Sequence, residues 1–235
     1  MASSDAVLRY VNSQEYADDF HAAHRMWKQS PTLGGSGMFI FTTYATLPPL
    51  TTVGSEGGGS DALMLRKAVG EGRAKNILVR LFNLDDNIGQ PAGLADPGVR
   101  RMLSGLGERH RVLRGMKDEY INMFAGIVAI SCLRLRSSLN ITVDAGELRR
   151  YWRYMRYSIA AFGAELGEHD AVSASCARFV ELHSGASRQT GTYLAHLSAA
   201  YPKYMSICGR ALFPATRRVV SGLLIADFPD GWPKR

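Results

Sequence analysis

The sequence contains only three cysteines, and none of them has the spacing of a metal site or of a disulfide framework. Cys132, Cys176 and Cys208 are far apart, and each lies within an apolar helical pattern. Cysteine-based zinc sites need closely paired cysteines, and disulfide-stabilised secreted domains have an even number of them. We therefore expect three reduced thiols that pack as small apolar side chains in the core.

Long hydrophobic runs are also missing. The longest, YINMFAGIVAISCL, covers residues 120–133, whereas a bilayer-spanning helix needs about 20 residues. The first residues lack the basic segment followed by an apolar stretch that marks a secretory signal. These absences predict a chain without a membrane span and a cytoplasmic location.

The common motifs of nucleotide binding are absent as well. The stretch GSEGGGS (54–60) has neither the lysine nor the preceding strand of a phosphate-binding loop. The net charge is +7, but the basic residues are spread along the chain rather than gathered in a lysine-rich block. Sparse basic residues do not suit a sequence-specific DNA-binding protein, so we expect no nucleic-acid partner. Dispersed arginines do suit a ligand that carries carboxylates or phosphates.

Helical periodicity is what the sequence does contain, with very little strand alternation. Apolar residues recur at steps of three or four over 13–28, 61–84, 97–114, 118–138 and the segment after Asp144, and shorter helices are predicted within 170–227. Asp96 followed by Pro97 is a typical helix start, and 54–61 is predicted to be a flexible loop. The 235 residues, 46% of them hydrophobic, suit one globular domain. We predict a single all-α domain over residues 1–235.

One histidine stands out because of its neighbours. His110 lies with Arg109, Arg111 and Arg114 in the predicted helix 97–114, directly before the most apolar segment. A neutral imidazole that faces an apolar site is a competent ligand for haem iron, and nearby arginines suit the two propionate carboxylates. The alternative is a solvated helix face, which is the common environment of a histidine between arginines.

Two further groups of residues form incomplete patterns. His21 and His24 lie three residues apart on a predicted helix, but no further ligand set accompanies them. Asp85 and Asp86 resemble the start of the motif that holds magnesium against a diphosphate in all-α terpene synthases, although position 89 is glycine where a third acid is expected. A magnesium-dependent enzyme of that type is one alternative, and a non-enzymatic helical protein that binds haem or another anion is a second.

Four stretches, in this order, resemble the MpaB/latex-clearing-protein family of haem b oxygenases. They are FIFTTYATLPP (39–49), EGRAKNI (71–77), the block around His110 (99–135) and the helix pair that follows (139–168), within a family-like core of about 38–185. The resemblance implies a helical bundle that encloses one haem b, with globin-like packing. It also implies an oxidoreductase that activates dioxygen or peroxide to oxidise a small organic substrate, isoprenoid or from a biosynthetic pathway. A homo-oligomer is compatible with it.

The resemblance further assigns roles to individual residues. His110 matches the proximal iron ligand, and Arg73 matches an arginine near the haem. Ile77 stands where the family has threonine and Asn76 where latex-clearing proteins have lysine, so the distal side is expected to differ. With Glu71 as the nearest acid, the catalytic candidates are Arg73, Asn76 and Glu71. The predicted haem-binding set consists of His110, Arg73, Ile77, Arg80, Arg111, Arg114, Tyr120 and Phe124.

Overall fold

The computed structural model describes residues 4–28, 73–84, 91–114, 118–138 and 141–182. These ranges are mostly helical and contain no strand, which confirms the predicted all-α class. The helices are α1 (Ser4–Val11), α2 (Glu15–Lys28), α6 (Arg73–Phe82), the short 3-10 helix η1 (Gly93–Ala95), α7 (Pro97–Arg114), α8 (Asp118–Ser138), α9 (Ala145–Phe162) and α10 (His169–Leu182). The predicted loop 54–61 and the predicted helices beyond 182 lie outside the described residues.

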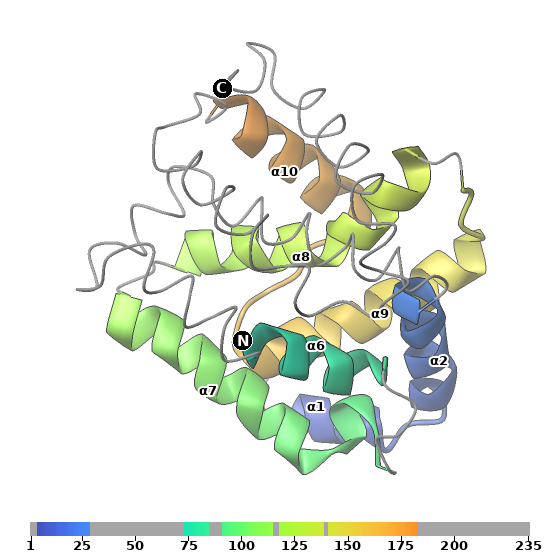
Figure 1. Cartoon of the computed structure of the whole chain (residues 1–235), viewed down its shortest axis with the longest axis vertical. Coiled ribbons are helices and arrows are strands. Elements are labelled where there is room, and N and C mark those ends of the chain that lie inside the picture. Colours follow the sequence, from blue (N-terminus) through green and yellow to red (C-terminus); the bar gives the residue numbers. More distant parts are fainter. Residues whose placement is uncertain (1–3, 29–72, 85–90, 115–117, 139–140, 183–235) are drawn as a thin grey trace, which may run out of the picture.

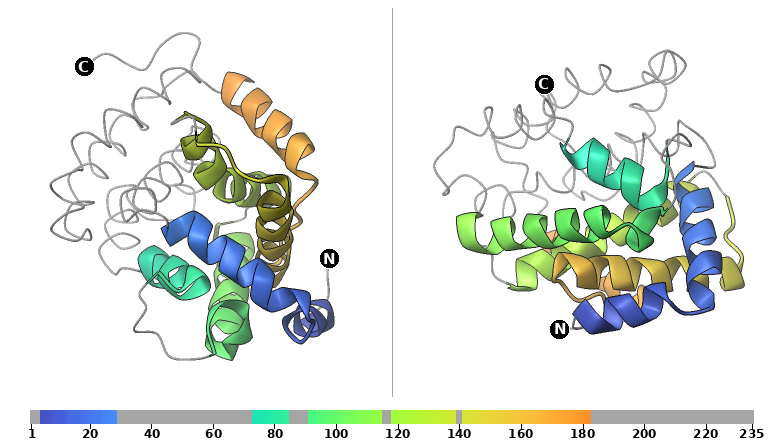
Figure 2. Two further views of the ribbon diagram at one scale, coloured as in Figure 1. Left: turned by 90° about the vertical axis from the view of Figure 1, so that its right-hand side faces the viewer. Right: turned by 90° about the horizontal axis from the view of Figure 1, so that it is seen from below.

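Helix α9 is the central element of the described part. It packs against α1, α2, α7 and α8, and α10 lies against α8 (Figures 1 and 2). The carboxylate of Asp144 accepts hydrogen bonds from the backbone N–H groups of Gly146 and Glu147, so the predicted helix start is confirmed. The apolar stripe of α9 is buried and its arginines are exposed; its buried residues include Trp152, Met155, Ile159 and Phe162.

Helix α2 presents its apolar face to this core. Phe20 and Trp27 are buried, and Tyr16 reaches the loop before α7. The imidazole Nδ1 of His24 lies 2.8 Å from the carbonyl oxygen of Phe82, the last residue of α6. His24 thus serves as a structural hydrogen-bond donor in α2, because a carbonyl only accepts.

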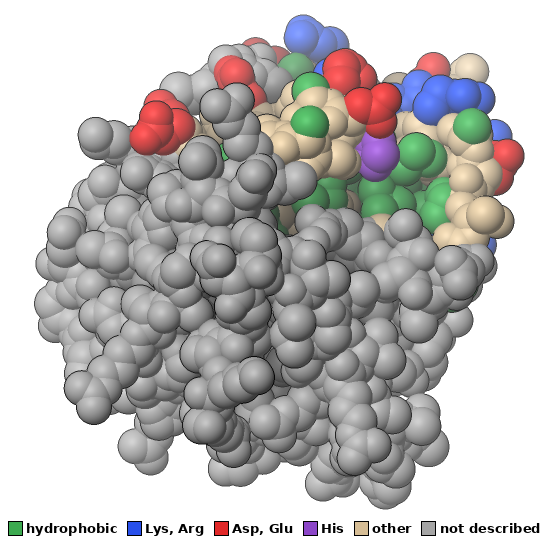
Figure 3. Space-filling view, turned by 90° about the horizontal axis from the view of Figure 1, so that it is seen from above, with side chains coloured by type: hydrophobic (Ala, Val, Ile, Leu, Met, Phe, Trp, Pro, Cys, Tyr) green, Lys and Arg blue, Asp and Glu red, His purple; other side chains and the backbone are tan. Residues whose placement is uncertain are grey.

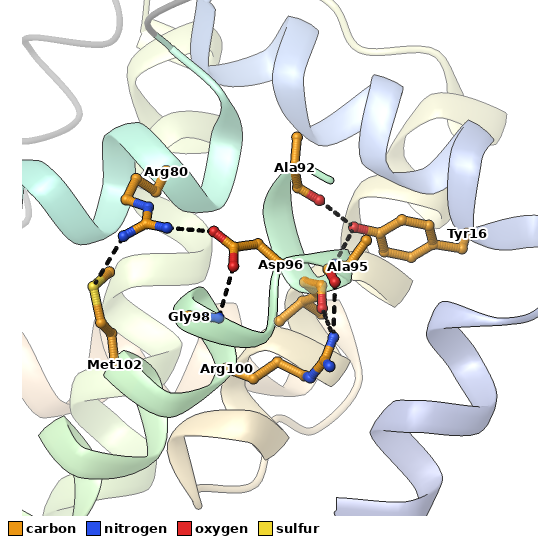
Figure 4. A network of polar contacts seen from close by, with 9 residues as sticks. Tyr16, Arg80, Ala92, Ala95, Asp96, Gly98, Arg100 and Met102 are labelled. Atoms are coloured by element: carbon orange, nitrogen blue, oxygen red, sulfur yellow. Dashed lines mark hydrogen bonds and ion pairs between the residues drawn. The ribbon is translucent and has the colours of Figure 1, made fainter. Parts of the chain in front are cut away.

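The corner between α6 and α7 is held by side chains that bind backbone groups (Figure 4). Asp96 accepts from the N–H of Gly98 at 2.7 Å and pairs with Arg80, which confirms the helix start predicted at Asp96 and Pro97. The hydroxyl of Tyr16 donates to the Ala92 carbonyl at 2.9 Å and accepts from the Ala95 N–H at 2.8 Å. The start of α7 is therefore fixed to both α6 and α2.

Helix α8 occupies the predicted residues, and none of the described helices is long and apolar enough to cross a membrane. Cys132 lies on α8 with 2% of its surface exposed, and burial raises the pKa of its thiol to about 11. The prediction of a reduced core thiol is confirmed for this cysteine. The side chain of Cys176 and all of Cys208 lie outside the described residues.

Candidate functional site

His110 lies where three helices meet. It sits on α7 with 9% of its surface exposed. Its ring centroid is 5.6 Å from that of Phe124 on α8 and 5.7 Å from that of Phe162 on α9. The two phenylalanine rings are 6.4 Å apart and complete a triangle of aromatic rings. Of the two environments that the sequence left open, the structure therefore places His110 in the apolar one.

A hydrogen bond within α7 defines the proton position on this imidazole. Nδ1 of His110 lies 2.8 Å from the carbonyl oxygen of Leu106, one turn earlier. Because a carbonyl oxygen only accepts, Nδ1 carries the hydrogen, and in the neutral ring the lone pair belongs to Nε2. Histidines that bind metals use this arrangement, with the second ring nitrogen donating to a carbonyl or carboxylate.

The arginines around His110 have different environments. Arg109 is exposed, whereas Arg111 is half-buried. The Arg111 guanidinium donates from Nε to the Asp118 carboxylate at 3.1 Å and from Nη2 to the carbonyl oxygen of Gly163. Arg111 therefore lies beside the histidine, as predicted, but binds protein groups on α8 and at the end of α9.

Arg80 is placed apart from this group. Its guanidinium pairs with Asp96 and contacts the sulfur of Met102, 3.9 Å away, near the start of α7 (Figure 4). Met102 and Arg111 lie nine positions apart on α7, or about 14 Å along the helix axis. The structure thus separates Arg80 from Arg111, and Ile77 packs against the core from α6.

The remaining predicted site residues fall partly outside the described residues. Phe124, one of the predicted haem-binding residues, lies beside the His110 ring. The backbones of four others lie in described helices, but their side chains are outside the described part of the structure: Arg73, Asn76, Arg114 and Tyr120. Glu71 and the aspartates of the magnesium alternative, Asp85 and Asp86, lie wholly outside it.

Sequence reasoning missed the contribution of the α9 C-terminus. Phe162 is not among the predicted site residues, yet its ring packs against His110, which is far away in the sequence. A side chain at Gly107 would overlap the carbonyl oxygen of Phe162, so α7 and α9 approach closely at this glycine. Two glycines, Gly107 in one helix and Gly163 at the end of the other, were the available signal of such an approach.

Charged groups do not form a single-sign patch on the described surface seen in Figure 3. Basic and acidic side chains lie near one another there, with hydrophobic ones between them. Within the described ranges, no three His, Cys, Asp or Glu side chains come together as a group of metal ligands. The candidate site is therefore defined by one imidazole and its apolar surroundings.

A separate buried polar cluster joins α1, α2 and α9. The side chain of Asp19 is fully buried, and its Oδ2 lies 2.7 Å from Nε of Arg153 and 3.1 Å from the hydroxyl of Tyr10. Burial raises the pKa of the Asp19 carboxyl, while Arg153 and Tyr10 act in the opposite direction. The Tyr10 ring also stacks on Tyr157 at 3.8 Å. This cluster fastens α1 to the rest of the fold.

Comparison of the chain with protein-family models, with curated proteins and with solved structures finds no match.

Proposed function

We propose that the protein binds one haem b through His110 and acts as an oxidoreductase of the oxygenase type. Its co-substrate would be dioxygen or peroxide, and its substrate a small organic molecule. The observation that carries the proposal is the 2.8 Å hydrogen bond between Nδ1 of His110 and the Leu106 carbonyl. This bond favours the tautomer in which Nε2 has the lone pair that an iron ligand needs.

Apolar side chains surround His110, as a haem site requires. Phe124 and Phe162 contact the imidazole, and buried Ile121 belongs to the same core. A porphyrin needs apolar surface for its ring and cations for its two carboxylates. Because protein carboxylates already engage Arg80 and Arg111, we assign the propionate contacts in this proposal to Arg73 and Arg114.

The haem would supply the redox chemistry with oxygen, and the chain would supply binding and orientation. His110 would hold the iron, and the phenylalanine rings would keep water away from it. Arg73, Asn76 and Glu71 remain the candidates for contact with substrate, as the family resemblance implies. A cytoplasmic location and a homo-oligomeric state also belong to this proposal.

Haemin titration of the purified protein tests the proposal. The wild-type protein is expected to bind one equivalent with a sharp Soret band, and His110→Ala is expected to weaken binding by at least about tenfold and to shift that band. His21→Ala is the matched control, because His21 is exposed on α2 and lies outside the site; its titration should equal that of the wild type. An identical spectrum and affinity in His110→Ala would refute the assignment of the ligand.

A further inference from the structure

The side chain next to His110 connects all three helices of the site. Arg111 belongs to α7, its Nε donates to Asp118 at the first residue of α8, and its Nη2 donates to the carbonyl oxygen of Gly163 at the end of α9. A guanidinium has five N–H groups in a rigid fork, so a single arginine can hold two acceptors in fixed directions. A lysine ammonium lacks this planar geometry.

Gly163 leaves room for the Arg111 guanidinium because it has no side chain. Gly163 has a left-handed φ of 87°, and a Cβ there would lie 2.8 Å from Nη1 of Arg111. The carbonyl that Arg111 binds also lies at the C-terminal end of α9, where the helix dipole favours a cation. Both the conformation of Gly163 and its missing side chain thus suit the guanidinium.

The two segments that Arg111 binds are those that supply the rings around His110. Phe162 directly precedes Gly163, and Phe124 lies less than two turns after Asp118 on α8. Figure 1 shows the last turns of α7 and the first turns of α8 on the same side of the molecule. Rings packed against the imidazole on two sides restrict its rotation and so preserve its bond to Leu106.

We propose that Arg111 is the positioning residue of His110: by joining α8 and α9 to α7, it keeps Phe124 and Phe162 against the imidazole and Nδ1–H on the Leu106 carbonyl. Arg111 then acts on His110 through the helices rather than by binding a propionate. The effect on iron ligation rests on the proposed function, whereas the effect on the imidazole is a property of the protein without haem.

The test reads the His110 tautomer directly in the haem-free, full-length protein. Long-range proton–nitrogen NMR correlations at pH 8 distinguish Nδ1–H from Nε2–H, and His110→Ala assigns the signals. Wild-type His110 is expected to be in the Nδ1–H form. In Arg111→Met the Nε2–H form, which is favoured in water, should become the major one, and Arg111→Lys should restore the Nδ1–H form only in part.

Two further variants make the outcome decisive. Asp118→Ala removes only the contact with α8, at a side chain that is 69% exposed, so it should fold and show an intermediate fraction of Nε2–H. Arg109→Met removes an exposed neighbouring arginine of α7 and should match the wild type. An unchanged Nδ1–H signal in both Arg111→Met and Asp118→Ala would overturn the inference. A wild-type protein that shows the Nδ1–H form and binds no haemin would instead end the proposed function alone.

Discussion

Gly107→Ala is expected to destabilise the folded protein by about 3 kcal/mol, at the upper end of the usual cost of overpacking. A Cβ at this position would overlap the carbonyl oxygen of Phe162, which is backbone and cannot rotate away as a side chain does. The two helices would have to separate, and the separation would displace the Phe162 ring from His110. Urea unfolding followed by circular dichroism measures the free-energy change.

Gly105→Ala is the matched control on the same helix. A Cβ at Gly105 would meet no atom within 4 Å, so the substitution removes only the flexibility of glycine and should stabilise the helix by up to about 1 kcal/mol. Both variants replace glycine with alanine, but Gly107→Ala should lower the free energy of unfolding and Gly105→Ala should raise it. Equal stability of Gly107→Ala and the wild type would contradict the close approach of α7 and α9 at this residue.

Arg153→Met is expected to destabilise the protein by about 2 kcal/mol at pH 8. Removing the cation leaves the fully buried Asp19 carboxylate with Tyr10 as its partner in the cluster. Breaking a buried pair costs roughly 3–5 kcal/mol, and the smaller value expected here reflects the Arg153 side chain, which is 46% exposed and already solvated. Urea unfolding over a range of pH measures the effect.

The loss of stability caused by Arg153→Met should depend on pH. Burial raises the pKa of Asp19 in the folded protein, and loss of Arg153 raises that pKa further. A raised pKa in the folded state means that Asp19 contributes stability when protonated and loses it as the pH increases through that pKa. The cost of Arg153→Met should therefore shrink as the pH is lowered from 8. Arg150→Met, an exposed neighbour on α9, should stay within about 0.5 kcal/mol of the wild type, and a pH-independent cost of Arg153→Met would contradict the role of Asp19.

Local signals in the sequence were sufficient to predict the described helices that carry the site. The start of α7 at Asp96 and Pro97 and the start of α9 after Asp144 follow from side chains that cap backbone groups within three residues. The buried face of α9 follows from its period of three to four residues. Helix α1 was not predicted, because its eight residues bury only Val7 and Tyr10 and depend on partners in α2 and α9.

The candidate site depended on contacts that no local pattern contains. The sequence places arginines beside His110, whereas the rings that contact it belong to Phe124 and Phe162. Arg111 binds Gly163, 52 residues away. The contact between Phe162 and His110 arises from the crossing of α7 over α9 at Gly107, which a single sequence does not reveal. The hydrogen bond from His110 to Leu106 joins residues one turn apart in the same helix, so helical spacing alone can predict it.

The absorption spectrum of the purified protein, with haemin supplied and then reduced, tests the central claim most directly. We expect a Soret band in the oxidised protein, sharpened visible bands after reduction, and a changed spectrum in His110→Ala. A protein that stays colourless after incubation with haemin and removal of the excess would contradict it.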